Sequence, residues 1–124
     1  MSDWEDLGGE AAVRGHLLAF LGRMSTDFIV GFLFEGRDLA RLADLELGHV
    51  ARILGGPVPY AGRPLAVAHR PLRINRGQFR RRLALLRTVL RERGVADDVI
   101  GRWVEHDRRF EAAICDGTDC GPPG

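Results

Sequence analysis

Lysine is absent from this chain of 124 residues, and all 18 basic residues are arginines. Because the arginines are spread along the whole sequence, we attribute this bias to codon usage in a GC-rich genome rather than to a site that selects anions. The 17 acidic residues nearly balance them and leave a formal net charge of +1. This balance does not favour nucleic acid or an anionic membrane surface as a partner.

Long hydrophobic runs are also missing. The longest apolar stretch, residues 28–34, is interrupted by Gly31 and is too short to cross a bilayer. The acidic N-terminus lacks the basic segment that opens a signal peptide. We therefore expect a cytoplasmic protein without a membrane anchor.

Cysteine is scarce, because only Cys115 and Cys120 occur, both within the last ten residues. Their spacing could close a small loop or chelate a metal weakly, but a flexible tail with incidental thiols is the simpler interpretation. The remaining composition, with 45% hydrophobic and 28% charged residues, is ordinary for a globular protein. We expect one domain over residues 1–114 and a flexible C-terminal tail over residues 115–124.

Apolar residues recur at three- and four-residue intervals, which is the spacing of one helix face. This pattern predicts a first helix over residues 10–24, after a Gly8-Gly9 turn that admits a positive φ. A second helix is predicted over residues 38–54, with Asp38 as its N-cap and the Gly55-Gly56-Pro57 segment as its end.

The second half of the chain has the same helical spacing. Pro64 and Pro71 bracket a helix of about two turns around His69. Asn75 is expected to cap a long helix that ends at Gly94, and a last helix is predicted from residue 96 to residue 114. No stretch alternates convincingly with a period of two, so the sequence predicts an all-α domain.

The four histidines differ in their surroundings. His16 and His106 have polar or mixed neighbours and are expected at the surface, whereas His49 lies at the rim of the apolar face of the second helix. His69 is flanked by apolar residues in its short helix. A histidine in such a setting is most often a hydrogen-bonded structural residue, and the residues alone leave this interpretation open beside that of a metal ligand.

Glu46 is unusual because steps of about 100° per residue place it at the centre of the apolar stripe of the second helix. A buried carboxylate is costly unless it is paired or protonated. Either the helix is turned so that Glu46 reaches an edge and meets an arginine, or Glu46 points into an internal cavity. The run Arg80-Arg81-Arg82 spreads over about 200° of its helix and is expected to form a solvated face.

An ordered set of motifs carries a family resemblance. Leu7-Gly8-Gly9-Glu10 precedes the first helix, Leu54-Gly55-Gly56-Pro57 follows the second with Tyr60 and Gly62 behind it, and Ala68-His69-x-x-Leu72-x-Ile74 is followed by Phe79. From Trp4 to Ile114 the chain resembles the truncated haemoglobins of bacteria, most nearly their first group.

This resemblance implies a two-over-two helical sandwich around haem b, with His69 as the proximal iron ligand. A backbone carbonyl can accept the other ring N–H of such a histidine and fix its tautomer. Phe34 stands where the family packs a phenylalanine against the porphyrin, and Tyr60 and Arg73 are expected to contact the haem propionates. The expected cofactor-binding set is completed by Leu42, Glu46, His49, Ile74 and Phe79.

The opposite, distal side of the haem departs from the family pattern. Its expected residues are Phe20, Leu21, Leu42, Glu46 and Val50. Leu21 replaces the family's ligand-binding tyrosine, Glu46 replaces its glutamine, and Val50 stands where a gating aromatic residue is often found. Leu21 cannot donate a hydrogen bond to bound dioxygen, and an ionised Glu46 only accepts, whereas a protonated one can donate.

Three functions follow from these features. The first is a haem globin that binds or transports oxygen, or binds another diatomic ligand such as NO or CO. The second is a haem redox enzyme, either a nitric oxide dioxygenase or a peroxidase-like enzyme that uses Glu46 as a general base on peroxide and an electron-donating reductase as a partner. The third is a haemless helical adaptor or sensor.

Overall fold

The computed structural model describes residues 2–60, 62, 69 and 72–115. Its helices in chain order are α1 (Asp3–Leu7), α2 (Gly9–Ser25), the 3-10 helix η1 (Gly31–Phe34), α3 (Leu39–Leu54), α5 (Arg76–Glu92), α6 (Asp97–Arg108) and α7 (Glu111–Ile114). Within the described residues, β structure is limited to one isolated bridge between Ile74 and Cys115. The prediction of an all-α fold is confirmed. In the same part of the chain, no helix combines the length and the apolar character that crossing a membrane requires.

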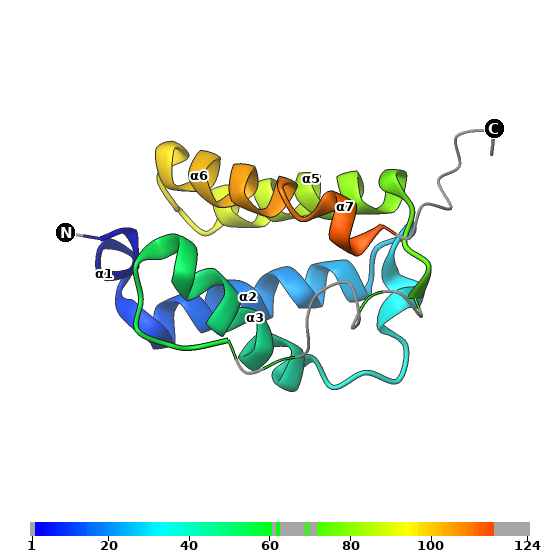
Figure 1. Ribbon diagram of the computed structural model, residues 1–124, viewed down its shortest axis with the longest axis horizontal. Coiled ribbons are helices and arrows are strands. Elements are labelled where there is room, and N and C mark those ends of the chain that lie inside the picture. Colours follow the sequence, from blue (N-terminus) through cyan, green and yellow to red (C-terminus); the bar gives the residue numbers. More distant parts are fainter. Residues whose placement is uncertain (1, 61, 63–68, 70–71, 116–124) are drawn as a thin grey trace.

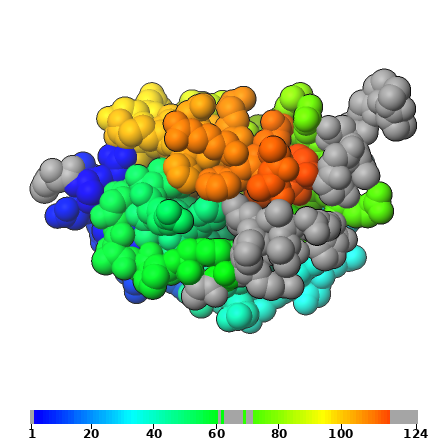
Figure 2. All heavy atoms as spheres, in the orientation of Figure 1, coloured from blue at the N-terminus to red at the C-terminus, as the bar shows by residue number. Residues whose placement is uncertain are grey.

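The long helices form two layers. Figure 1 shows α2 and α3 running antiparallel in one layer and α5 and α6 running antiparallel in the other. On one face of the molecule, α6 (orange) lies against α3 (green), as Figure 2 shows. Buried apolar side chains from every long helix meet between the layers, and those that are almost fully buried include Val13, Leu17, Phe20, Leu54, Phe79, Leu86, Leu90 and Trp103.

Local signals set most helix ends where they were predicted. The Asp38 carboxylate accepts hydrogen bonds from the backbone N–H groups of residues 40 and 41, and Asn75 forms a capping box with Gln78. Gly55 and Gly94 take positive φ angles of 82° and 80°. Glycine adopts such angles without the steric cost that a Cβ brings, so the chain leaves α3 and α5 at these positions.

The buried face of α3 differs from the predicted one. Val50 is buried as expected, but Leu39, Leu42 and Ile53 are only half-buried. The fully buried residues of α3 are Ala43, Leu47, Gly48, Val50, Ala51 and Leu54. The helix is therefore turned by roughly 100° from the predicted stripe, and Glu46, at the centre of the predicted stripe, lies at the edge of the buried face.

Gly48 explains this rotation. A Cβ at Gly48 would overlap the carbonyl oxygen of Pro59 and would lie 2.7 Å from the Cα atom of Tyr60. The backbone of residues 59–60 therefore lies directly on α3, and only glycine at position 48 leaves room for it. This contact turns the Gly48 side of the helix inward, beyond what the large apolar side chains alone predict.

Two further details differ from the sequence expectation. The last helix is not continuous, because α6 ends at Arg108 and α7 begins at Glu111. The short helix α1 was not predicted; it buries Trp4 against the core. His69 lies in helical conformation, but Pro64 and Pro71, the predicted limits of its helix, lie outside the described residues. The same holds for Cys120 and for residues 116–124 of the predicted tail.

Candidate functional site

The predicted distal residues lie in or beside the core. Phe20, Leu21 and Val50 are 0%, 2% and 3% exposed, respectively, while Leu42 is half-buried and packs against the core. Helices α2 and α3 therefore supply an apolar wall at these positions. With Leu21 in place of tyrosine, this part of the wall carries no hydroxyl group.

Glu46 is half-buried at the edge of this wall and contacts an arginine. Its two carboxylate oxygens lie 3.1 Å and 3.2 Å from Nη2 of Arg82, and one-quarter of its side chain is exposed. This arrangement matches the first interpretation of Glu46, in which the side chain reaches an edge and meets an arginine. Its use as a general base remains a prediction.

Arg82 corrects the prediction of a solvated arginine face. Its side chain is 20% exposed, lies 5.0 Å above the ring of Phe20, and contacts Asp107 as well as Glu46. Burial opposes the charge of Arg82, but the two carboxylates outweigh it and raise the pKa of the guanidinium above its usual value. Of its two neighbours, Arg80 is exposed, whereas Arg81 pairs at 2.6 Å with the buried carboxylate of Asp27.

Asp107 on α6 is the third member of this charged cluster. An oxygen of its carboxylate accepts a hydrogen bond of 3.2 Å from Nη2 of Arg82, and its side chain is 12% exposed. Burial and the nearby charge of Glu46 raise the pKa of Asp107 to about 6, although the charge of Arg82 acts in the opposite direction. Arg82, Glu46 and Asp107, here called the Arg82 cluster, thus connect α5, α3 and α6.

The residues predicted on the proximal side have varied environments. His69 is half-buried, Ile74 and Phe79 are buried, and Phe34 is half-buried on η1 against the core. Arg73 is exposed and takes a φ of 53°. Such an angle is uncommon for a residue with a Cβ and is found where the surroundings or a function hold the backbone.

His49 and Tyr60, two of the predicted cofactor-binding residues, are brought together by the close contact at Gly48. Their ring centroids lie 5.3 Å apart, and His49 also packs against Phe110 at 4.6 Å and His106 at 6.4 Å. His106 is therefore half-buried in an aromatic cluster rather than a surface residue as predicted. Burial lowers the pKa of both histidines, and the Nδ1 atom of each is buried without a hydrogen-bond partner among the residues that the structure describes.

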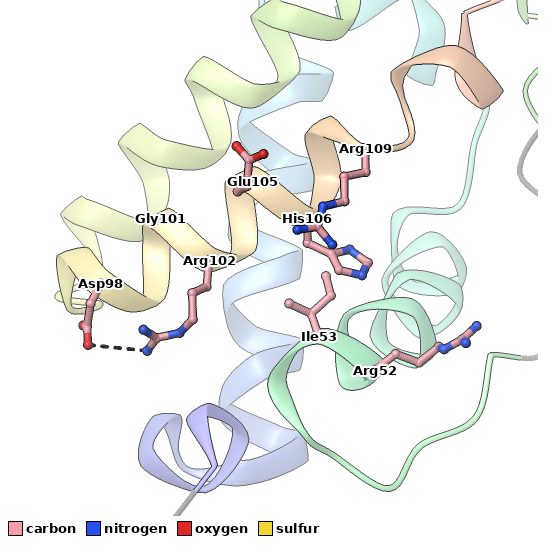
Figure 3. Close-up of a pocket in the computed structure, with 8 residues that line it drawn as sticks. All are labelled: Arg52, Ile53, Asp98, Gly101, Arg102, Glu105, His106 and Arg109. Carbon is pink, nitrogen blue, oxygen red and sulfur yellow. Dashed lines mark hydrogen bonds and ion pairs between the residues drawn. The ribbon is translucent and has the colours of Figure 1, made fainter.

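Figure 3 shows a groove whose lining includes His106. It lies between α3 and α6, has a volume of about 570 Å³, and contains an ion pair of 3.4 Å between Asp98 and Arg102. Its lining is mostly charged and consists of Arg52, Ile53, Asp98, Gly101, Arg102, Glu105, His106 and Arg109. None of the predicted site residues lines this groove, and its polarity does not suit a porphyrin.

The predicted site, in contrast, has the chemistry that haem needs. Haem requires an apolar slot, an imidazole for the iron and polar groups near the ligand. The described residues supply buried apolar walls on α2, α3 and α5, the half-buried imidazole of His69, and buried polar atoms without partners at Nε of Arg82 and Nδ1 of His49. These residues fit the group.

Comparison with known proteins agrees with this fit. A model of the bacterial-like globin family matches residues 2–115. A group 1 truncated haemoglobin of Tetrahymena thermophila is 29% identical over 109 residues, which cover 86% of this chain and 90% of the relative. The group 1 truncated haemoglobin GlbN of a Nostoc species is 26% identical over 111 residues, covering 90% and 94% of the two chains.

Solved structures give the same result for the fold. The 2/2 haemoglobin of a Synechococcus species, solved with covalently attached haem, superposes with a TM-score of 0.84 at 25% identity and covers 92% of this chain and 98% of that chain. The truncated haemoglobin of Tetrahymena pyriformis also gives a TM-score of 0.84, at 24% identity, over 93% of this chain and 98% of that chain. The fold is therefore the two-over-two arrangement of truncated haemoglobins. With a family match over nearly its whole length and this fold, the chain belongs to the bacterial-like globin family.

Proposed function

We propose that this protein binds haem b and takes up dioxygen or another diatomic ligand at an iron held by His69. The observation that carries this proposal is the family match over residues 2–115, because it includes His69 and both apolar walls of the site. The relatives are named as haemoglobins, and the similar 2/2 haemoglobin of a Synechococcus species was solved with covalently attached haem. Bound haem would supply the iron at which the ligand is taken up.

The chain's own residues would hold and shield this group. The imidazole of His69 would coordinate the iron, while Phe34, Leu42, Ile74 and Phe79 would provide apolar contacts. Tyr60 and Arg73 would reach the propionates, for which a guanidinium fork is well suited. The buried side chains of Phe20, Leu21 and Val50 would exclude water from the distal side.

Absorption spectroscopy tests the proposal. The purified protein is expected to show a Soret band that His69→Ala shifts or abolishes, and added imidazole should restore the wild-type spectrum by replacing the lost ligand. His16→Ala is the matched control, since His16 lies on α2 and accepts a hydrogen bond of 2.8 Å from Arg93. A colourless, folded protein that does not take up added haemin would contradict haem binding and favour a haemless adaptor.

A second candidate function is peroxide chemistry, and the Glu46–Arg82 contact favours it. A carboxylate can take a proton from hydrogen peroxide as a general base, and a neighbouring guanidinium can stabilise the negative charge that develops on the departing oxygen. An electron-donating reductase would supply the reducing equivalents. Nitric oxide dioxygenation has less support, because Leu21 removes the donor that serves bound ligand in relatives of this type.

Glu46→Gln tests this second function. Since general acid–base catalysis contributes about 10²- to 10⁴-fold, peroxide turnover should fall by about a hundredfold or more, and the pH dependence of the ferric spectrum should change. Asp44→Asn, which removes an exposed carboxylate from the same helix, is the control. Unchanged turnover together with an unchanged pH dependence would leave Glu46 as an ion-pair partner only.

A further inference from the structure

Arg82 occupies an unusual place, because its guanidinium contacts residues from the other three long helices. It lies over Phe20 of α2 and within 3.2 Å of carboxylate oxygens on Glu46 of α3 and Asp107 of α6. Two of these contacts, Phe20 and Glu46, are residues predicted to line the distal pocket. The guanidinium therefore lies beside two of the predicted distal residues, although Arg82 itself was not among them.

One buried N–H donor of Arg82 takes no part in these hydrogen bonds. Both carboxylates are contacted through the same nitrogen, Nη2. Nε, which also carries an N–H group, is buried and lacks a hydrogen-bond partner in the described part of the chain. Buried N–H groups nearly always have a partner, so an unpaired one in a guanidinium that contacts two predicted distal residues points to an acceptor supplied by a bound group.

We propose that Arg82 is the distal hydrogen-bond donor of this globin and that its charge makes the site favour anionic ligands. This inference rests on the proposed haem-binding function. Leu21 offers no donor where relatives of this type have a tyrosine, and Arg82 supplies one from α5 instead. Glu46 and Asp107 hold the guanidinium in place through Nη2 and leave Nε without a partner among the described residues.

A guanidinium differs from a tyrosine hydroxyl in its effect on ligands. It stays charged at every accessible pH and donates without accepting. It therefore stabilises a bound ligand that carries negative charge, such as fluoride or azide, and gives little to a neutral ligand such as imidazole. Asp107 competes with the ligand for this charge, so removal of the Asp107 carboxylate should strengthen anion binding.

The alternative is a purely structural ion cluster, in which Arg82 only neutralises two buried carboxylates. The two roles differ in a measurable way. A structural Arg82 affects folding and haem retention, but it does not change the ratio between anionic and neutral ligand affinities. A distal donor changes that ratio.

The test compares Arg82→Met with Arg80→Met in the haem-loaded, ferric, full-length protein. Fluoride and imidazole are titrated by absorption, and the stretching frequency of bound carbon monoxide is measured by infrared spectroscopy in the ferrous state. A hydrogen bond to a charged group corresponds to about a ten- to hundredfold change in affinity. We expect Arg82→Met to lower the affinity for fluoride by this factor and to change the affinity for imidazole by less than about threefold. The stretching frequency of bound carbon monoxide should rise.

Arg80→Met should leave all three measurements unchanged, because Arg80 is exposed and only loosely paired with Glu111 at 3.7 Å. Asp107→Asn keeps Arg82 and should strengthen fluoride binding severalfold, so it decides the question if Arg82→Met does not retain haem. Wild-type fluoride affinity in Arg82→Met, or weaker fluoride binding in Asp107→Asn, would overturn the inference.

The test also separates this inference from the function on which it rests. If the wild-type protein takes up no haem, or if His69→Ala leaves its spectrum unchanged, the proposed function fails and the inference fails with it. If the wild-type spectrum depends on His69 but the fluoride-to-imidazole ratio is insensitive to Arg82, only the inference fails.

Discussion

Replacing Asp107 by asparagine should remove a pH dependence of folding stability that the wild-type protein shows between about pH 4 and pH 7. Burial raises the pKa of Asp107 from 3.8 to about 6 in the folded protein. A raised pKa means that the folded state binds the proton more tightly than the unfolded state does. The contribution of Asp107 to the free energy of unfolding is therefore most favourable at low pH, and it falls as the pH rises from 3.8 to about 6.

The size of the effect follows from the shift. One pKa unit corresponds to 1.36 kcal/mol, so a rise from 3.8 to about 6 makes the full difference about 3 kcal/mol. Because only 12% of the Asp107 side chain is exposed, solvent screening reduces this value little. Most of the change falls between about pH 4 and pH 7.

The assay is urea unfolding followed by far-ultraviolet circular dichroism at closely spaced pH values. The free energies of unfolding of wild type and variant are subtracted at each pH, so contributions from groups that the substitution does not affect cancel. The difference should shift by about 3 kcal/mol in favour of Asp107→Asn as the pH rises. Asp44→Asn, on the exposed side of α3, controls for the loss of one negative charge. A difference that stays constant with pH would refute the conclusion that burial raises the pKa of Asp107.

Two further predictions concern the elements that position the site. Gly48→Ala should destabilise the protein by about 1–3 kcal/mol in urea unfolding, because the added Cβ would overlap Pro59. Gly22→Ala is the control, since Gly22 lies in a helix interior and a Cβ there would meet no atom within 4 Å. This substitution should be neutral or stabilise the protein by up to about 1 kcal/mol. Equal effects of both substitutions would show that the segment at Pro59 does not press on α3. Asn75→Ala should lower the midpoint of thermal unfolding at a cost of about 1 kcal/mol, since it removes the capping box with Gln78; Asn75→Ser, which can still accept from the N3 backbone, should restore most of it.

Helix ends were predictable from sequence because their causes are local. Asp38, Asn75, Gly55 and Gly94 act on groups within a few residues of themselves, and each ends or begins a helix where its chemistry requires. The buried face of α3 was less predictable. Its rotation depends on a backbone contact at Gly48 from a segment about ten residues away, and a glycine adds nothing to an apolar stripe.

The Arg82 cluster was missed for a related reason. The carboxylate of Glu46 was predicted in an apolar stripe, and the last helix carries a similar signal that the prediction did not include. Steps of about 100° per residue place Asp107 close to the directions of Trp103 and Ile100, and Arg82 about 60° from that of Phe79. Glu46 and Asp107 thus lie on the apolar faces of their helices, and Arg82 lies beside that of a third helix. This is the pattern of a buried ion cluster. Their pairing is nevertheless set by tertiary packing, which the sequence alone does not specify.

The cluster also bears on how a globin site can work without its usual donor. Leu21 leaves the α2 wall apolar, and a neutral hydroxyl there would need no counter-charge. A guanidinium on α5 does need one, because an unpaired buried charge is far more costly than a neutral polar group. Glu46 and Asp107 meet this requirement from two other helices, and burial, together with the charge of Glu46, raises the pKa of Asp107. A negatively charged ligand would compete with these carboxylates for Arg82, so ligand charge and the protonation of Asp107 should be coupled in this protein.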